Sequence, residues 1–437
     1  MDQRIVVALI GLGIMLVLLA MGTNIGITFG VVGFLGFWYV RQDFNAAFGM
    51  FRSLPFNFAL NYNQSVLIMF TLMGQIAFQA GLSQGLYDAA DKWLCKFRGG
   101  LCMATITACA GFASICGSST ATSATMGTVA LPEMKKYGYA DSLAAGCVAA
   151  GGTLGILIPP SNIFIIYGLL VEESIGRLFA AGVFPGILLT LCYIACVAVV
   201  VKINPSLVKA PYSATWEERF KSLKGLVGVV VLFVVVIGGM FGGWFTANEA
   251  AAAGVFVATI IMWLNKRLTW ANYVSALKNG MKTVGMVMLT LVGCTMFGNF
   301  LSITQLPVRL AAAVGGMEVS RFVVIGVLLV FYIIMGCIMD SLPLCVLTVP
   351  IFLPLIHTLG FSTIWYGVFM VMVCQMGTIT PPVGINIFVV AGVAKSVPLE
   401  TVFKGVLPFT LALLVAVLFV IFVPGLATWL PSVLYVR

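Results

Sequence analysis

Long apolar runs separated by short polar segments dominate the chain from end to end. Residues 5–40 form one such run, interrupted at Met21–Asn24, and residues 60–81 form the next. A helix needs roughly 20 predominantly apolar residues to cross the hydrocarbon core of a bilayer. Strand-like alternation is missing from these runs, which disfavours a membrane β-barrel. The pattern therefore predicts an all-α polytopic membrane protein with about ten helical spans.

The two halves of the chain interrupt their apolar runs at matching places. Three landmarks recur in one order at offsets of 222 or 223 residues, namely Pro159 and Pro381, Ser119 and Ser341, and Gly182 and Gly405. This regularity predicts an internal repeat. Counting the spans between the copies predicts that the repeats are inverted in the membrane, as they are in many secondary transporters.

Each repeat contains a polar tip and a double proline. Residues 101–131 and 320–356 both fit two short apolar arms, which meet at Cys116–Thr122 and at Gly336–Pro343. Arms of this length suit re-entrant hairpins better than spans. A double proline leaves upstream carbonyls unpaired, and inside a membrane such a break survives only beside a protein cavity or an ion. A single break of this kind could be a proline kink whose unpaired backbone groups bond to neighbouring helices. Two such breaks, related by the internal repeat, instead favour two broken helices that meet two re-entrant hairpins near the membrane midplane.

These features divide the chain into scaffold, arms and transport repeats. The predicted segments are scaffold spans 1–81, an amphipathic arm 82–100, a first transport repeat 101–202, a cytoplasmic loop with scaffold spans 203–303, a second arm 304–319, a second transport repeat 320–404, and a final span 405–437.

Composition and charge place this fold in a membrane. Hydrophobic residues make up 61% of the chain and charged residues 8%, whereas soluble domains carry about 25% charged residues, so lipid must be the solvent. Residues 202–224 and 265–282 are rich in Lys and Arg and flank a pair of spans, which assigns both loops to the cytoplasm. Counting outward predicts a multi-pass protein of the bacterial inner membrane with both termini in the periplasm. The net charge of +9 on a membrane protein usually reports cytoplasmic loops, so no nucleic-acid partner is expected.

Four of the eleven cysteines follow a seven-residue spacing: Cys95, Cys102, Cys109 and Cys116. Residues seven apart on a helix lie about 10 Å from each other, which is too far for a disulfide. The single histidine, His357, is distant in sequence. We interpret these cysteines as small packing residues, with redox or metal roles as the alternatives.

At these motifs the sequence resembles the large membrane subunit of tripartite ATP-independent periplasmic (TRAP) transporters. The resemblance covers nearly the whole chain, and its matching stretches begin at Arg98, Gly117, Pro132, Ile158, Leu178, Met339, Thr380 and Leu430. The cysteine-rich first hairpin departs from the family pattern. The resemblance implies an elevator-type transporter of the ion transporter superfamily, driven by sodium. It also implies two partners, a separately encoded small four-helix membrane subunit and a periplasmic substrate-binding protein.

A small organic anion with a carboxylate or sulfonate is the expected substrate, held between the two tips. Hydroxyls, amides and the N-termini of half-helices suit such a ligand. The expected substrate-binding residues are Ser118, Ser119, Thr120, Asn162, Asp340, Ser341 and Asn386. Asp340 is the only acid at either tip. It is either a functional intramembrane acid or the cap of the half-helix that begins near Leu342.

Na+ is the expected coupling ion, and no organic cofactor is expected. The resemblance points to backbone oxygens where each hairpin tip meets its break. In the second half these belong to Gly336, Gly377, Thr380 and Val383, and the offset of 222 transfers them to Ser114, Gly155, Ile158 and Ser161, with Pro160 as a neighbour.

Three other readings compete with this one. The nearest is a dicarboxylate–sodium symporter of the same superfamily, which would need no binding protein. An integral-membrane enzyme is disfavoured because no clustered acid–base or metal site is recognisable, so the chain is expected not to be an enzyme. A channel would be built from symmetric subunits with rings of like residues, and this chain instead carries an internal inversion.

Overall fold

The protein is helical throughout the part of the chain that the structure describes. The computed structural model describes residues 3–209, 211–316, 319–337, 339–381, 384–395 and 397–435, and all regular structure in these ranges is helical. Within these ranges six helices are long and apolar enough to cross a membrane, and ten shorter apolar helices accompany them. The predicted all-α polytopic class is therefore confirmed. The count of about ten spans depends on the shorter helices and stays a prediction.

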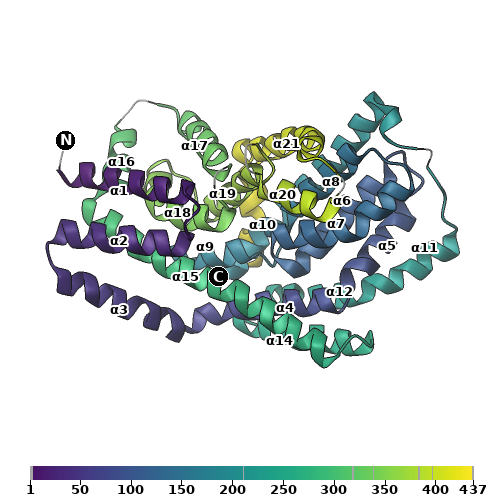
Figure 1. The fold of residues 1–437 in the computed structure, drawn as a ribbon, viewed down its shortest axis with the longest axis horizontal. Coiled ribbons are helices and arrows are strands. Elements are labelled where there is room, and N and C mark those ends of the chain that lie inside the picture. The colour runs from purple at the N-terminus through teal and green to yellow at the C-terminus, as the bar shows by residue number, and fades with distance from the viewer. Residues whose placement is uncertain are drawn as a thin grey trace.

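The N-terminal helices gather at one end of the molecule (Figure 1). They are α1 (Gln3–Ala20), α2 (Ile25–Arg41) and α3 (Phe44–Leu60). Asn24 caps α2 by accepting hydrogen bonds from the backbone N–H groups of Gly26 and Ile27, which explains the predicted turn. α2 packs along the 35-residue helix α15 (Trp270–Thr304). A Cβ atom on Gly293 would lie 2.0 Å from the carbonyl oxygen of Gly26, so small residues allow this close helix contact.

The predicted span at 60–81 and the arm after it form two helices at a sharp angle. α4 (Ser65–Gln79) and α5 (Leu82–Leu94) are bent by 65°, with Gly81 in the left-handed region at φ +77°. α5 buries Leu82, Leu86 and also Asp91, and it exposes Asp88. Its role as an amphipathic arm in the membrane plane stays a prediction.

The first repeat region contains five α-helices. They are α6 (Gly100–Cys116), α7 (Ser119–Lys136), α8 (Asp141–Thr153), α9 (Asn162–Val171) and α10 (Ile175–Ile203). α8 runs into a 3₁₀ turn at Leu154–Ile156, and the chain is irregular from there to Ser161, across Pro159 and Pro160. The helix therefore breaks where the prolines remove backbone donors.

Two candidate membrane spans join the two repeat regions: Trp216–Phe241, which is built from several consecutive helical segments, and Ala247–Leu264. In chain order the segments are a 3₁₀ turn Pro205–Leu207, α11 (Trp216–Ser222), a 3₁₀ turn Leu223–Leu226, α12 (Val227–Phe233), a π-helical segment Val234–Gly238, α13 (Gly239–Phe241) and α14 (Ala247–Leu264). Another 3₁₀ turn, Tyr62–Gln64, precedes α4.

The second repeat region follows α15. Its helices are α16 (Leu306–Gly315), α17 (Arg321–Gly336), α18 (Ser341–Thr358), α19 (Thr363–Thr378), α20 (Ile385–Ala394), α21 (Leu399–Phe422) and α22 (Gly425–Leu434). α19 ends before Pro381 and α20 begins after it, so a helix break lies at the predicted place here too. The inverted relation of the two halves stays a prediction.

Both tips are shorter than the sequence suggested. α6 ends at Cys116 and α7 begins at Ser119, so Thr120 and Thr122 are already helical. In the second half α18 begins at Ser341, which places Leu342 and Pro343 in its first turn. The side chains of Ser118 and Asp340 cap the following helices, and such capping lets a helix start early.

Candidate functional site

The two tips meet at one polar cavity. It has a volume of about 440 Å³ and is lined from both halves of the chain. Six of the seven predicted substrate-binding residues line it: Ser118, Ser119, Thr120, Asn162, Asp340 and Ser341. Residues predicted from two distant stretches of sequence are thus brought together around a single space.

Three helices begin at this cavity. Ser119, Asn162 and Ser341 are the first residues of α7, α9 and α18, and all three line the space. The N-terminus of a helix carries partial positive charge from its aligned peptide dipoles. The arrangement therefore favours a ligand with negative charge.

Asp340 caps α18 and also lines the cavity. Its Oδ1 atom accepts a hydrogen bond from the backbone N–H of Ser341 at 2.7 Å. Both roles considered for this acid are therefore compatible with its position. When it is ionised, its carboxylate places negative charge at the edge of a cavity that is otherwise suited to anions.

Asn386 lies behind the cavity wall. The side chain is fully buried, and its Nδ2 atom donates to Ser119 Oγ at 2.7 Å and to the carbonyl oxygen of Ala149 at 3.3 Å. It contacts the cavity only through Ser119 and does not line the space.

The predicted sodium residues of the first half lie where tip and break touch. A Cβ atom on Gly155 would lie 2.4 Å from the carbonyl oxygen of Ser118, and one on Gly117 would lie 3.0 Å from that of Pro160. The N–H of Asn162 donates to the carbonyl of Gly117 at 3.4 Å. These contacts bring backbone oxygens of the tip and of the break close together.

The remaining residues of this first set take part in local hydrogen bonds. Ser114 is buried one turn before the tip, and its hydroxyl donates to the carbonyl of Gly111 at 2.7 Å. The Ser161 hydroxyl donates to the carbonyl of Ile156 at 2.6 Å. The N–H of Ile158 donates to the carbonyl of Leu154 at 3.1 Å.

The second half repeats the contact between tip and break. A Cβ atom on Gly377 would lie 2.2 Å from the carbonyl carbon of Gly336, so these two backbones are in direct contact. The Thr380 hydroxyl donates to the carbonyl of Met376 at 2.5 Å, and the Thr380 N–H donates to the carbonyl of Gly377 at 3.3 Å. The fourth predicted residue, Val383, lies outside the described residues.

The hydroxyl groups of the predicted sodium sites and those of the predicted substrate site differ in their hydrogen bonds. In both sodium sets every side-chain hydroxyl, on Ser114, Ser161 and Thr380, gives its proton to a carbonyl and keeps its oxygen as an acceptor. In the substrate set the Ser341 hydroxyl has no partner within the described residues. The Ser119 oxygen accepts from Asn386, and no acceptor for its proton is present there either. The first group suits a hard cation, which prefers oxygen ligands, and the second suits an anion.

Other metal chemistry has little support in the described ranges. Over these ranges no group of three or more His, Cys, Asp or Glu side chains could hold a metal ion. Cys102 and Cys109 are fully buried inside α6 among hydrophobic residues.

Sequence reasoning missed the opposite wall of the cavity. Thr71 and Gln75 of α4 and Thr283 of α15 line it. Thr71 and Gln75 are four residues apart, so they share one helix face. Two polar residues on one face of a membrane helix are a signal that could have identified them.

Known proteins are similar to this chain in sequence and in fold. Residues 12–426 match the family described as "Tripartite ATP-independent periplasmic transporter, DctM component". The C4-dicarboxylate TRAP transporter large permease protein DctM of Pseudomonas aeruginosa is 33% identical over 373 residues, which cover 85% of this chain and 87% of that protein. The isethionate TRAP transporter permease protein DctMQ of Oleidesulfovibrio alaskensis is 33% identical over 365 residues. That match covers 82% of this chain and 56% of the longer relative.

Two further similarities concern another substrate class and the fold. The sialic acid TRAP transporter permease protein SiaT of Haemophilus influenzae is 31% identical over 369 residues, covering 84% of this chain and 59% of that protein. Among solved structures, the YdaH transporter of Alcanivorax borkumensis has a TM-score of 0.67 at 14% identity, covering 94% of this chain and 98% of that one. At this identity the structural similarity concerns the fold alone.

Proposed function

The chain belongs to the DctM family, the large membrane subunits of tripartite ATP-independent periplasmic transporters, and on that premise we propose that it couples sodium entry to the uptake of a small organic anion. It is a membrane permease and not an enzyme, as are the relatives named above. The observation that carries the proposal is the difference in hydrogen bonding between the hydroxyl groups of the predicted sodium sites and those of the predicted substrate site. At the predicted cation sites the hydroxyl oxygens of Ser114, Ser161 and Thr380 stay available as acceptors. At the predicted anion site the hydroxyl protons of Ser119 and Ser341 have no acceptor within the described residues.

The substrate is proposed to carry a carboxylate or sulfonate. The relatives' names specify a C4-dicarboxylate, isethionate and sialic acid, all of which are organic anions. Three helix N-termini supply partial positive charge to such a group, and the hydroxyls of Ser119 and Ser341 offer donors. A volume of about 440 Å³ is within the range of small-molecule sites.

The residues around each contact between tip and break fit a sodium ion. Carbonyl and hydroxyl oxygens are the ligands that hard cations accept, and glycines at 155, 336 and 377 allow the backbone to approach closely. A bound sodium ion would supply positive charge beside the anion site. Such charge would also offset the Asp340 carboxylate, which otherwise repels an anionic substrate.

An elevator movement is proposed for the two halves together. α6 and α7 and the break after α8 would move as one body with α17, α18 and the break after α19. Helices α4 and α15 line the other side of the cavity and would form part of the fixed scaffold.

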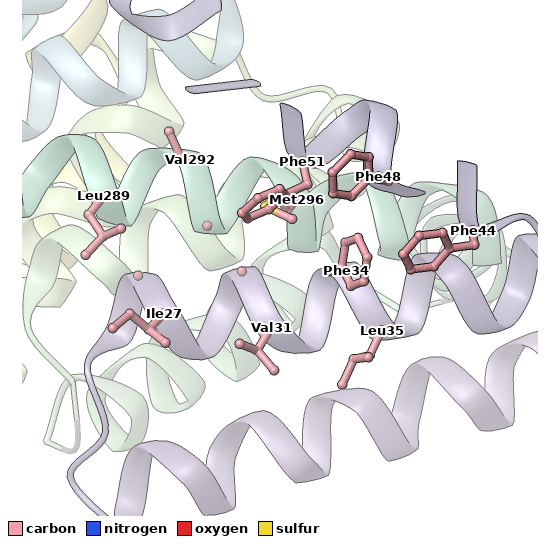
Figure 2. Close-up of a pocket in the computed structure, with 13 residues that line it drawn as sticks. Ile27, Val31, Phe34, Leu35, Phe44, Phe48, Phe51, Leu289, Val292 and Met296 are labelled. Carbon is pink, nitrogen blue, oxygen red and sulfur yellow. The ribbon is translucent and has the colours of Figure 1, made fainter. Parts of the chain in front are cut away.

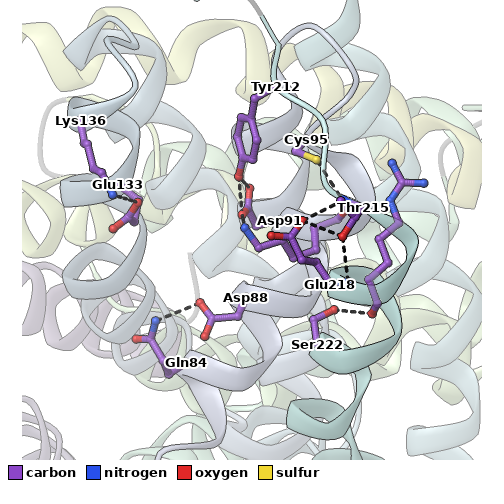
Figure 3. Close-up of polar contacts among 12 residues, drawn as sticks. Gln84, Asp88, Asp91, Cys95, Glu133, Lys136, Tyr212, Thr215, Glu218 and Ser222 are labelled. Atoms are coloured by element: carbon purple, nitrogen blue, oxygen red, sulfur yellow. Dashed lines mark hydrogen bonds and ion pairs between the residues drawn. The ribbon is translucent and has the colours of Figure 1, made fainter.

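The cytoplasmic face is proposed to contain the loop at 204–215 (Figure 3). There the Tyr212 hydroxyl donates to the Asp91 carboxylate, and the Tyr212 ring stacks on Tyr137 with centroids 4.8 Å apart. Burial and the adjacent carboxylate raise the pKa of the Tyr212 phenol, so it stays a hydrogen-bond donor at neutral pH. The second Lys- and Arg-rich loop, at 265–282, contacts the start of the arm that contains Asp91, because Asn265 donates to the carbonyl of Ala80 at 3.0 Å. We therefore assign both positive loops to the same side of the membrane.

Tyr435, the last described residue, lies at the end of α10 that is farther from Leu207. Arg177, near the start of α10, donates to the carbonyl of Tyr435. Beyond the other end of α10, Leu207 accepts a hydrogen bond from the N–H of Ala140. A helix of 29 residues is about 44 Å long, which is enough to separate two membrane faces.

We therefore predict the topology by reporter fusion. Alkaline phosphatase fused after Arg437 should be active, because that end is proposed to be periplasmic, and the same reporter fused after Lys221 should be inactive. A green fluorescent protein at the same two positions is the control and should give the reverse pattern. Activity after Lys221 would contradict both the topology and the inverted repeats.

An apolar groove on the N-terminal helices is proposed to bind the small membrane subunit (Figure 2). The groove has a volume of about 490 Å³ and lies between α2, α3 and α15. Phe34, Phe44, Phe48 and Phe51 line it, and the last three are about half exposed. Exposed aromatic side chains at a hydrophobic groove suit an amphipathic or membrane helix.

The complete complex is expected to be required for uptake. Purified chain in liposomes should take up no labelled C4-dicarboxylate, isethionate or sialic acid, even with a sodium gradient. Addition of its small subunit and its binding protein should give uptake of one of these anions. Uptake without a binding protein would instead support the sodium symporter alternative.

A further inference from the structure

We propose that Asn386 is a positioning residue, which turns the proton of Ser119 into the cavity and makes this hydroxyl a donor to the substrate. The proposal rests on the proposed function, since it takes the cavity to be the anion site. Sequence reasoning had placed the Asn386 amide itself on the substrate. Its position behind Ser119 suggests a different role.

The orientation of the Asn386 amide follows from its two contacts. Its Nδ2 atom lies 2.7 Å from Ser119 Oγ and 3.3 Å from the carbonyl oxygen of Ala149. A backbone carbonyl can only accept, so the end of the amide that faces Ala149 must be the NH₂ group. That same NH₂ group then also donates to Ser119. The contact with the Ala149 carbonyl assigns the two ends of the amide, and the Oδ1 atom is then left without a partner within the described residues.

This orientation decides the role of the Ser119 hydroxyl. Since its oxygen accepts from Asn386, its only proton must point elsewhere. Ser119 is the first residue of α7, so no carbonyl four residues earlier in the same helix is available to it. Within the described residues the proton has no acceptor, and Ser119 lines the cavity. The natural acceptor is an oxygen of the bound anion.

Within the described residues, this pairing of an asparagine with a tip serine occurs in the first half of the protein and not in the second. Ser341 is the counterpart of Ser119 at the offset of 222 and begins α18, but its hydroxyl has no partner within the described residues. The counterpart of Asn386 is Phe164, a fully buried apolar residue. Ser119 is therefore a donor held in place, whereas no described residue fixes the direction of the Ser341 hydroxyl. This asymmetry would fix which end of an unsymmetrical substrate faces the first tip.

A double-mutant cycle between Asn386 and Ser119 tests the proposal. Asn386→Leu keeps the approximate shape and removes the donor, and Ser119→Ala removes the hydroxyl. The wild type, both single variants and the double variant are reconstituted with the small subunit and the binding protein. Initial uptake of labelled C4-dicarboxylate, isethionate and sialic acid is then measured, and the ratio of maximal rate to half-saturating concentration is compared.

We expect each single variant to lower this ratio about tenfold, which corresponds to the loss of one hydrogen bond to a charged group. The double variant should be no worse than Ser119→Ala alone, because Asn386 acts only through that hydroxyl. Effects that multiply would overturn the proposal, as would normal uptake by Asn386→Leu. If Asn386→Leu does not assemble, Asn386→Ser removes the amide without apolar bulk and replaces it in the cycle.

Tyr167→Phe is the matched control. The Tyr167 hydroxyl donates to the carbonyl of Thr363 at 2.6 Å, so it also forms a buried hydrogen bond between the two halves, but away from the cavity. Its uptake ratio should stay within about twofold of wild type. An equal loss in this control would mean that any bond between the halves matters, which contradicts a specific role for Asn386. Failure of the wild-type complex to take up any of the three anions would instead refute the proposed function.

Discussion

Gly377→Ala is expected to reduce transport by roughly tenfold or more, through overpacking at the second contact between tip and break. The added methyl group would lie 2.2 Å from the carbonyl carbon of Gly336 and 2.5 Å from its oxygen. Neither atom can move without shifting the end of α17 or of α19. The shift would also displace the backbone oxygens that we assign to the second sodium site.

Gly392→Ala is the control for this substitution. Gly392 also lies in a helix of the second half, but an added methyl group there meets no atom within 4 Å. Initial uptake by the complete complex and the amount of assembled complex in the membrane are measured together. Near-normal uptake by Gly377→Ala would mean that this contact opens during transport, and the second sodium site would then have to be placed elsewhere.

Asp340→Asn is expected to raise the sodium concentration needed for half-maximal uptake by roughly tenfold. The reason is the lost attraction between the carboxylate and a bound sodium ion, which at an effective dielectric constant of about 20 is worth at least about 1.4 kcal/mol over a few ångströms. Asparagine caps a helix as well as aspartate does, so the hydrogen bond to the Ser341 N–H is retained while the charge is lost. The variant therefore separates the two roles that the position of Asp340 allows.

The measurement is the sodium dependence of initial uptake at a fixed, saturating concentration of loaded binding protein. Asp88→Asn removes a carboxylate from the exposed face of α5 and should leave the sodium dependence unchanged. An unchanged half-saturating concentration in Asp340→Asn, with a loss in Asp340→Ala, would show that this residue is only a helix cap.

The positions of the tips and breaks could be predicted because local chemistry determines them. Pro159, Pro160 and Pro381 remove backbone donors, and Ser118 and Asp340 supply caps, so helices end and begin within a few residues of the expected places. These signals lie within short stretches of sequence and do not depend on packing.

The side chain of Asn386 and the far wall of the cavity could not be predicted in the same way. The direction of Asn386 depends on where α20 starts its first turn, after Gly384 at φ +58°, and proximity to a break does not determine this. Thr71 and Thr283 reach the cavity because α4 packs against α15. That contact joins spans about 200 residues apart in the sequence, and hydrophobic periodicity carries no information on it.

Sodium coupling of anion uptake is the central claim, and one measurement tests it most directly. The complete complex is reconstituted in liposomes with labelled substrate and loaded binding protein outside, and a gradient of sodium or of protons is imposed separately. We predict accumulation with an inward sodium gradient, and no accumulation with an inward proton gradient in sodium-free buffer. Accumulation driven by the proton gradient and unaffected by sodium would contradict the account.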